Sequence, residues 1–514
     1  MPHAAAARMA SRERDAGRYQ RHRPEQTLLY QIVDEYYPAF AAHLAEQGRE
    51  LPSYLQREFE EFLKCGRLEH GFLRVRCESC HTEHLVAFSC KRRGFCPSCG
   101  ARRMAESAAL LIDEVLPEQA MRQWVLSFPY PLRFLFASRP EIMGRVLGIV
   151  HRVIATHLVR KAGYTHDRAR TGAVTLIQRF GSALNLNIHF HMLFLDGVYV
   201  DQPNGAARFR WVKSLSSAEI TRLTHTIAHR VGRFLERQGL LERDADDCMD
   251  AGGRATQGAV AENSYLASDA VDDDPMTPLL GHSITCRIAV GPQAGRKVFT
   301  LQTLPASGEL FDDGAGKMAG FSLHAGVAAR ADERKKLERL CGYISRPAVS
   351  EQRLSLTPNG NVRYQLKTPY RDGTTHVIFE PLDFIARLAA LVPKPRVNLT
   401  RFHGVFAPNS KHRALVTPAK RGRGNQVRVV EERPSPAERR ASMTWAQRLK
   451  RVFNINIETC SVCDGAMKVI ACIEDPVVIT QILDHLEHKA EASEPRALPE
   501  SRAPPVGLQS GLFD

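Results

Sequence analysis

The sequence predicts an α+β fold divided into about three domains. The chain has 514 residues, which is more than one hydrophobic core usually holds. Between residues 117 and 410, short apolar segments typical of strands are interspersed with amphipathic segments typical of helices. Six of the twelve cysteines lie before this region, within residues 65–103, which indicates a separate cysteine-rich unit.

The N-terminal part begins with residues 1–25, which are rich in Arg, Ala and Gln and lack the apolar run of a secretory signal. We expect a disordered basic arm there. Residues 26–64 are predicted to be helical because their apolar residues recur at helical spacing. A further helix is expected over 102–116, so residues 26–116 should form one domain around the cysteines.

The central region, 117–410, is predicted to mix strands and helices. Strands are expected at 123–128, 173–178, 186–195, 208–212, 284–290, 298–304, 353–356, 362–366 and 376–379. Helices are expected at 141–161, at 217–237, from the cap Asp332 to a point before Pro347, and at 382–391. An acidic stretch at about 239–280 has little apolar periodicity and should be a disordered insertion.

The C-terminal part is predicted to contain a basic linker, a small folded unit and a tail. From Lys394 to Arg451 there are 15 Lys or Arg and three acidic residues, a net charge of +12 in a chain whose total is +14. We therefore expect nucleic-acid contact, with 411–452 as a flexible linker. Residues 453–490 should form a small unit with a helix from Pro476 to Leu486, and 491–514 a disordered tail.

Composition also bears on membranes and redox state. No apolar run is expected to be long enough to span a membrane. Because the chain shows no export signal, its cysteines are expected to be reduced. Their clustering therefore favours metal binding over disulfide bonds.

Two cysteine pairs have the spacing of a zinc ribbon. Cys77-Glu-Ser-Cys80 and Cys96-Pro-Ser-Cys99 are separated by fifteen residues, and together they are predicted to hold one tetrahedral Zn²⁺. Extra candidates, for a second metal or as plain buried thiols, are Cys65, Cys90 and His84. Basic residues in and after the intervening loop, which indicate a surface for nucleic-acid backbone, are Lys91, Arg92, Arg93, Arg102 and Arg103.

A further pair, Cys460-Ser-Val-Cys463, has no evident partner pair. Residues that could complete a metal site with it are Cys472, His485 and His488. The alternative is a pair of thiols without a metal, and the sequence leaves both interpretations open.

The segment Asn185-Leu-Asn-Ile-His-Phe-His-Met-Leu-Phe-Leu-Asp-Gly197 is predicted to be a strand with two histidines on one face. Side chains two residues apart on a strand project together, so His189 and His191 should share a face. Ile188, Phe190 and Met192 should point the other way into a core. Two neutral imidazoles side by side are half of a divalent-metal site that can polarise a phosphate.

Tyr343 lies near the end of the helix that follows Asp332. Core packing is the ordinary role of a helical tyrosine. A phenol opposite a metal-bound phosphate can instead attack phosphorus and retain the broken bond as a phosphotyrosine. The nearby Arg339 and Arg346 would favour the approach of DNA.

Four motifs that follow one another along the chain resemble those of the bacterial rolling-circle transposases of the HUH superfamily. Within that superfamily they resemble the insertion-sequence ninety-one group and its ISCR (common-region) relatives. They are Ser-Cys-Lys-Arg-Arg-Gly-Phe-Cys-Pro-Ser-Cys, Asn-Leu-Asn-Ile-His-Phe-His, Cys-Gly-Tyr-Ile-Ser-Arg-Pro and Arg401-Phe-His-Gly-Val-Phe-Ala-Pro-Asn409. The resemblance runs over about residues 28–490 and fails in the acidic insertion and the termini.

The resemblance implies a ferredoxin-like HUH nuclease core with a central antiparallel sheet. It implies that His189 and His191 bind Mg²⁺ or Mn²⁺ and that Tyr343 nicks single-stranded DNA, becoming joined to the 5′ phosphate. Two-tyrosine members carry a second tyrosine four residues earlier, where this chain has Arg339, as in the single-tyrosine ISCR type. The third metal ligand we select is His324, with Asn187 and Gln178 as rivals.

The expected function is therefore a DNA-nicking and strand-joining transposase that mobilises an insertion sequence. A plasmid relaxase or replication initiator would share its chemistry, and a zinc-dependent nucleic-acid-binding protein without catalysis is the alternative from another class. The zinc ribbon and the Arg401–Asn409 segment favour the transposase. Expected partners are single- and double-stranded DNA at the insertion-sequence ends and target, in the bacterial cytoplasm at the nucleoid. No membrane partner is expected, and a homo-oligomer is left open.

Overall fold

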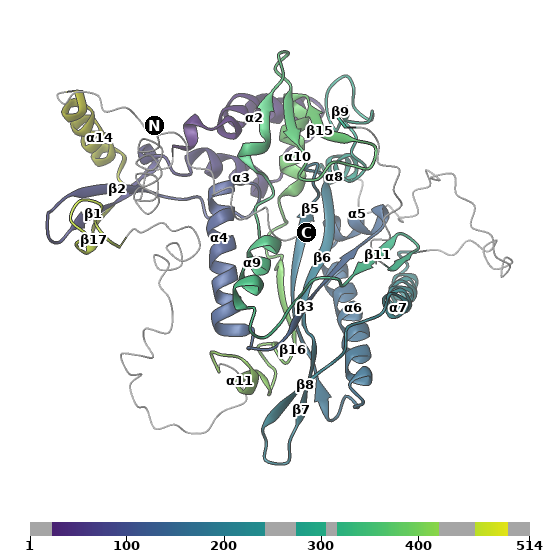
Figure 1. The fold of residues 1–514 in the computed structure, drawn as a ribbon. Coiled ribbons are helices and arrows are strands. Elements are labelled where there is room, and N and C mark those ends of the chain that lie inside the picture. The colour runs from purple at the N-terminus through teal and green to yellow at the C-terminus, as the bar shows by residue number, and fades with distance from the viewer. Residues whose placement is uncertain (1–22, 242–273, 305–315, 421–457, 492–514) are drawn as a thin grey trace, which may run out of the picture.

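The computed structural model describes residues 23–241, 274–304, 316–420 and 458–491 (Figure 1). Nearly all of the predicted basic arm, most of the acidic insertion, most of the basic linker and the predicted tail lie outside these ranges.

An antiparallel seven-stranded sheet occupies the centre of the molecule. Its strand order is β10-β11-β3-β6-β5-β16, and β12 also pairs with β3. The strands are β3 (Met121–Ser127), β5 (Gly172–Phe180), β6 (Leu186–Leu195), β10 (Gly316–Met318), β11 (Phe321–His324), β12 (Ala328–Ala329) and β16 (Thr400–Gly404). The histidine strand β6 therefore lies in the interior of the sheet, between β3 and β5.

Helices cover both faces of this sheet (Figure 1). One face packs on α5 (Tyr130–Ser138) and α6 (Pro140–Lys161), with α7 (Ser217–Arg237) beside α6. The other face packs on α9 (Arg334–Ile344) and on α4 (Pro97–Leu110), which a π-helical turn extends to Val115. The two cores are built by alternate residues of the same strands, as the period of a strand requires.

Helix α6 is long and apolar enough to cross a membrane by length and composition, contrary to the sequence-based expectation. Its apolar side chains, from Ile142 to Val159, belong to the main hydrophobic core. This packing explains its hydropathy, because the central helix of a globular core meets the same criteria.

The N-terminal helices share that core. The predicted helical stretch is divided into α2 (Leu28–Glu46) and α3 (Ser53–Lys64), with Gly48 at positive φ between them. Helix α2 packs against α10 (Pro381–Leu391), and its buried residues join the same cluster as those of the central sheet. Residues 26–116 therefore do not have a core of their own.

Three smaller antiparallel sheets surround the centre. One contains β13 (Leu354–Leu356), β14 (Val362–Gln365), β15 (Thr374–Phe379) and β9 (Phe299–Gln302), and another β4 (Ala169–Arg170), β7 (Gly197–Asp201) and β8 (Ala207–Trp211). The strand predicted at 284–290 is wrong, because α8 (Thr277–Ile284) ends there and the chain makes only one bridge, Arg287 to Lys297. The N-cap of α9 is Glu333, not Asp332.

The third small sheet joins a hairpin of the N-terminal region to a strand near the C-terminal end of the described residues. Strand β17 (Met467–Ile473) pairs with β1 (Phe72–Cys77), which in turn pairs with β2 (Glu83–Ala87). Helix α14 (Pro476–Glu491) follows β17, and Figure 1 shows it beside this sheet, away from the centre. The described part of the predicted unit at 453–490, from residue 458 onward, is thus part of a shared module with residues of the N-terminal region. Within the predicted flexible linker at 411–452, α11 (Arg413–Val416) belongs to the fold, and Val416 is part of the core on the α9 side of the sheet.

Candidate active site and zinc-binding cysteines

His189 and His191 lie on the face of β6 that is directed toward α9. Their ring centroids are 4.9 Å apart and both side chains are buried. Ile188, Phe190 and Met192 belong to the core on the opposite face, so the predicted alternation is confirmed.

Hydrogen bonds at Nδ1 determine which nitrogen of each ring can bind a ligand. His189 Nδ1 lies 2.8 Å from the carbonyl oxygen of Asn187. A carbonyl only accepts, so this Nδ1 carries the proton and Nε2 keeps its lone pair. His191 Nδ1 lies 2.7 Å from the side-chain amide of Gln123, whose oxygen and nitrogen can exchange places, so the same tautomer is available there.

Both imidazoles are held in the neutral form. Burial lowers the pKa of His189 to about 4, and it lowers the pKa of His191 well below its ordinary value. Metal ions bind neutral imidazole, so the pair is suited to a divalent cation at neutral pH. Gln123, which orients one ring, was not identified from the sequence, although a polar residue inside an apolar strand was an available signal.

The three candidates for a third metal ligand differ in their position relative to the histidine pair and in their hydrogen bonds. Asn187 lies two residues before His189 on the same face of β6, and its Oδ1 is buried without a hydrogen-bond partner among the described residues. Gln178, opposite His189 on β5, donates from Nε2 to the carbonyl of Ile344 at 3.2 Å. His324 is two strands away from β6, and among the described residues it is not grouped with the two histidines within 4.8 Å.

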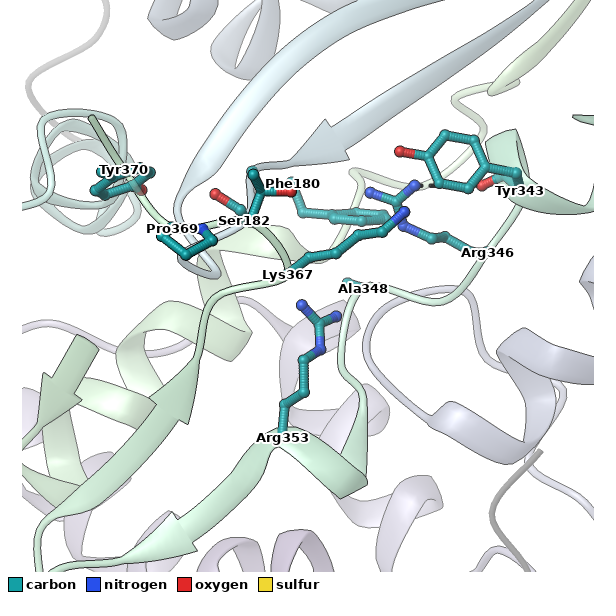
Figure 2. A pocket seen from close by; sticks show the side chains of 11 residues that line it. Phe180, Ser182, Tyr343, Arg346, Ala348, Arg353, Lys367, Pro369 and Tyr370 are labelled. Carbon is teal, nitrogen blue, oxygen red and sulfur yellow. Dashed lines mark hydrogen bonds between the residues drawn. The ribbon is translucent and has the colours of Figure 1, made fainter. Parts of the chain in front are cut away.

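Tyr343 is in the last turn of α9 and lines a cavity of about 320 Å³ (Figure 2). The Arg346 guanidinium carbon lies 4.3 Å from the centre of the phenol ring, and Lys367 Nζ lies 4.4 Å from it. Figure 2 shows Arg353 extending toward the same space from the other side. Burial by itself raises the pKa of Tyr343, but the charges of Arg346 and Lys367 outweigh it and the pKa is lowered overall.

One hydrogen bond and one nearby charge relate the tyrosine helix to the histidine pair. Gln178 holds the end of α9 against the strand that flanks His189. The charge of Arg346 contributes to the lowered pKa of both histidines as well as to that of Tyr343. One cation therefore acts on all three side chains. Arg339, one helical turn before Tyr343, is exposed.

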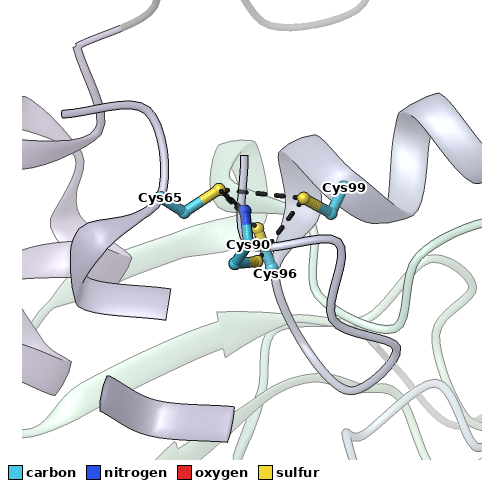
Figure 3. Close-up of side chains that lie close together, drawn as sticks. All are labelled: Cys65, Cys90, Cys96 and Cys99. Carbon is cyan, nitrogen blue, oxygen red and sulfur yellow. Dashed lines mark hydrogen bonds between the residues drawn. The ribbon is translucent and has the colours of Figure 1, made fainter. Parts of the chain in front are cut away.

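Eight of the eleven cysteines that the structure describes form two groups of four, and the sulfur atoms of each group lie within 4.8 Å of one another. The first, shown in Figure 3, contains Cys65, Cys90, Cys96 and Cys99. Its sulfur atoms are 3.4 to 3.7 Å apart in three of its pairs. Four sulfurs at about 2.3 Å from a tetrahedral zinc ion would be about 3.8 Å apart, so the group has the dimensions of such a site.

The predicted grouping of Cys77, Cys80, Cys96 and Cys99 around one ion is wrong. The second group contains Cys77, Cys80, Cys460 and Cys463, so each predicted pair has a different partner pair. Cys65 and Cys90, named only as extra candidates, complete the first group. His84, Cys472 and His485 belong to neither group, and the side chain of His488 lies outside the described residues.

The predicted basic surface beside the cysteines is partly used for internal bonds. Arg93 donates to the carbonyl of Val397 at 2.7 Å, and Arg103 donates to the carbonyls of Lys91 and Arg92. Arg102 pairs with Glu106 at 3.0 Å. These arginines stabilise the loop around the first cysteine group.

Two family models match the chain. One described as "Putative transposase" matches residues 172–414, and one described as "Transposase zinc-binding domain" matches residues 32–128. No curated protein and no solved structure matches it. The first match contains the histidine strand and Tyr343, and the second contains the first cysteine group. The chain therefore belongs to the transposases of the insertion-sequence ninety-one type and carries their zinc-binding domain in its N-terminal part.

Proposed function

We propose that this transposase nicks single-stranded DNA at insertion-sequence ends with Tyr343 as the nucleophile and transfers the strand in rolling-circle transposition. The observation that supports the proposal is the hydrogen bond from Gln178, which lies opposite His189 on β5, to the carbonyl of Ile344 beside Tyr343. The antiparallel sheet that presents them would correspond to the HUH nuclease core. In this proposal it acts on single- and double-stranded DNA at the nucleoid.

The residues at the histidine pair fit a divalent cation. The two Nε2 lone pairs and the unpartnered Oδ1 of Asn187 are a mixed nitrogen and oxygen donor set on one strand, which suits Mn²⁺ and Mg²⁺. A cation held by His189, His191 and Asn187 would neutralise charge on the scissile phosphate. Asn187 replaces His324 as the proposed third ligand, because its oxygen is already on the face of β6 that carries the pair.

The side chains around Tyr343 suit attack on phosphorus. The phenol oxygen forms a bond to the phosphorus atom while the bond from phosphorus to the 3′ oxygen of the preceding nucleotide breaks. The phenol proton is lost, and the departing 3′ oxygen gains one to become a hydroxyl. Arg346 and Lys367 favour the phenolate before attack and neutralise phosphate charge afterwards. Attack by a free 3′ hydroxyl on the phosphotyrosine reverses the step and joins strands.

The test is cleavage of single-stranded oligonucleotides that carry the DNA flanking the gene, with Mn²⁺ present. Tyr343→Phe should abolish both cleavage and the covalent 5′ adduct while the fold is retained. Tyr370→Phe, which changes a phenol lining the same cavity, is the matched control and should cleave normally. His189→Ala should reduce metal-dependent cleavage by more than about a hundredfold. An adduct that persists in Tyr343→Phe, or full cleavage by His189→Ala, would contradict the proposal.

A further inference from the structure

The second cysteine group joins parts of the chain that are far apart in sequence. Cys77 Sγ lies 3.5 Å from Cys463 Sγ, and Cys80 Sγ lies 3.5 Å from Cys460 Sγ, across sequence separations of 386 and 380 residues. A disulfide would require about 2.05 Å, so these are separate thiols. Cys460 and Cys463 also lie beyond residue 128, where the match to the zinc-binding domain ends.

The two cysteine pairs are presented by matching turns. His81 N–H donates to the carbonyl of Cys77 at 3.1 Å, and Asp464 N–H donates to the carbonyl of Cys460 at 3.1 Å. His81 and Asp464, each directly after the second cysteine of its pair, both have positive φ, at 63° and 57°. Two turns with the same hydrogen bond and the same left-handed residue hold both sulfurs of each pair on one side, as tetrahedral metal coordination requires.

The module that contains these turns has a small hydrophobic core. Among the described residues its cluster has three buried members, Leu68, Phe72 and Ile479, and five partly buried side chains pack against them. Units with so small a core usually need a metal or disulfides to remain folded. Strand β17 adds to the attachment by pairing with β1 from Phe72 opposite Ile473 to Cys77 opposite Met467, and α14 packs against residues 68–70.

We infer that Cys77, Cys80, Cys460 and Cys463 bind a second zinc ion, which fastens the C-terminal residues 458–491 to the β1–β2 hairpin. The site is structural, because all four tetrahedral positions are filled by cysteine. It differs from the first cysteine group in access, since Cys80 and Cys463 are exposed whereas Cys65, Cys96 and Cys99 are buried. The second zinc should therefore leave first when a chelator is added.

Zinc content of the full-length protein tests the site. The reduced wild type should hold two zinc ions per chain, and the double variant Cys460→Ser, Cys463→Ser should hold one. Cys472→Ser is the matched control, because Cys472 is an exposed cysteine on β17 outside both groups, and it should retain two. One zinc in the wild type, iron in place of zinc, or two zinc ions in the double variant would each overturn the inference.

Alkylation of the wild type gives a test that does not depend on a variant. In the native protein the second cysteine group should be protected from alkylation. Its four thiols, Cys77, Cys80, Cys460 and Cys463, should become reactive together when a chelator removes the zinc ion that they bind. Cys472 should react throughout. Exposed Cys80 and Cys463 that react before any zinc is released would contradict the inference.

Whether the zinc ion holds the C-terminal residues to the rest of the protein can be measured separately. A specific protease site inserted after Gly424 allows the chain to be cut between α11 and β17. The C-terminal fragment should remain bound to the rest of the protein in Cys472→Ser and in the otherwise unchanged protein, and it should separate after chelation or in the double variant. A fragment that stays bound without zinc would show that β1–β17 pairing alone is sufficient and that the ion fastens nothing.

Discussion

Tyr343 lies beside two cations whose charges oppose the effect of burial on its hydroxyl. Lys367→Met removes one charge and should raise the pKa of the phenol, so less phenolate is present at neutral pH. We expect cleavage of single-stranded DNA at neutral pH to slow by roughly ten- to a hundredfold. The pH–rate profile should move to higher pH, and Lys367→Arg, which keeps the charge, should leave it nearly in place. A profile that does not move in Lys367→Met would exclude this role.

His151 on α6 and His403 on β16 form a half-buried pair outside the proposed active site. Their ring centroids are 4.7 Å apart, and neither Nε2 has a hydrogen-bond partner among the described residues. Burial lowers the pKa of His151 to about 3 and that of His403 to about 4. The nearby charges are Arg152 and Arg401, and Phe194 stacks on His151.

This pair should make the protein sensitive to acid. A histidine whose folded pKa is lowered binds protons mainly when unfolded, so the free energy of unfolding decreases as pH falls from about 6.5 toward the folded values. His403→Phe should make that decrease smaller. Denaturant unfolding at several pH values between 7 and 4 measures it, and an unchanged slope in the variant would assign acid sensitivity to other groups.

At the scale of elements, α10 is tied to its neighbours by a buried ion pair. Asp383 and Arg387 are each 1% exposed, with Arg387 Nε 3.4 Å from Asp383 Oδ2. Arg387 also donates to the carbonyl of Ser283 at 3.2 Å, and Asp383 accepts from the Ala289 N–H at 2.6 Å. The pair therefore connects α10 with the end of α8 and the segment after it.

Removing one partner should leave a buried charge without compensation. We expect Arg387→Met to lower the free energy of unfolding by about 3–5 kcal/mol. Arg330→Met is the control, because the ion pair of Arg330 with Asp332 has exposed side chains and should contribute little. Denaturant titration of both variants checks this, and equal effects would mean that burial of the α10 pair does not matter.

For the whole molecule, the first cysteine group is joined to the central core. Leu29, Phe59 and Phe95 belong to the same hydrophobic cluster as Phe190 of the central sheet, and so do Cys96 and Cys99. The sequence predicted instead a separate domain around the cysteines at residues 26–116. Cys96→Ser should therefore lower the stability of the entire fold, in one transition.

Two probes can distinguish these outcomes. Far-ultraviolet circular dichroism reports on the helices, which include α2 and α3. With Trp211 and Trp445 replaced by Phe, fluorescence of the fully buried Trp124 reports on the central sheet. In Cys96→Ser the two signals should change at the same, lower temperature. A separate early transition that leaves Trp124 unaffected would support two independent domains.

The elements that were predicted well carry strong local signals. Helix α7 spans Ser217–Arg237 as expected, with a Ser216–Glu219 capping box at its start and an apolar stripe along its length. The period-two alternation of β6 was sufficient to place both histidines on one face. Helix α5 was missed and a strand was predicted wrongly at 284–290, because short apolar segments fit a helix or a strand equally well.

The sequence by itself determined which residue types are available for chemistry and which face of a strand or helix each one occupies. It did not determine which faces meet. Cys77 and Cys80 lie beside cysteines 380 or more residues away only because β17 pairs with β1. The charge of Arg346 acts on both Tyr343 and the histidines only because α9 packs on the central sheet. Local periodicity follows from backbone geometry within a few residues, whereas pairing between distant segments depends on the packing of the whole chain.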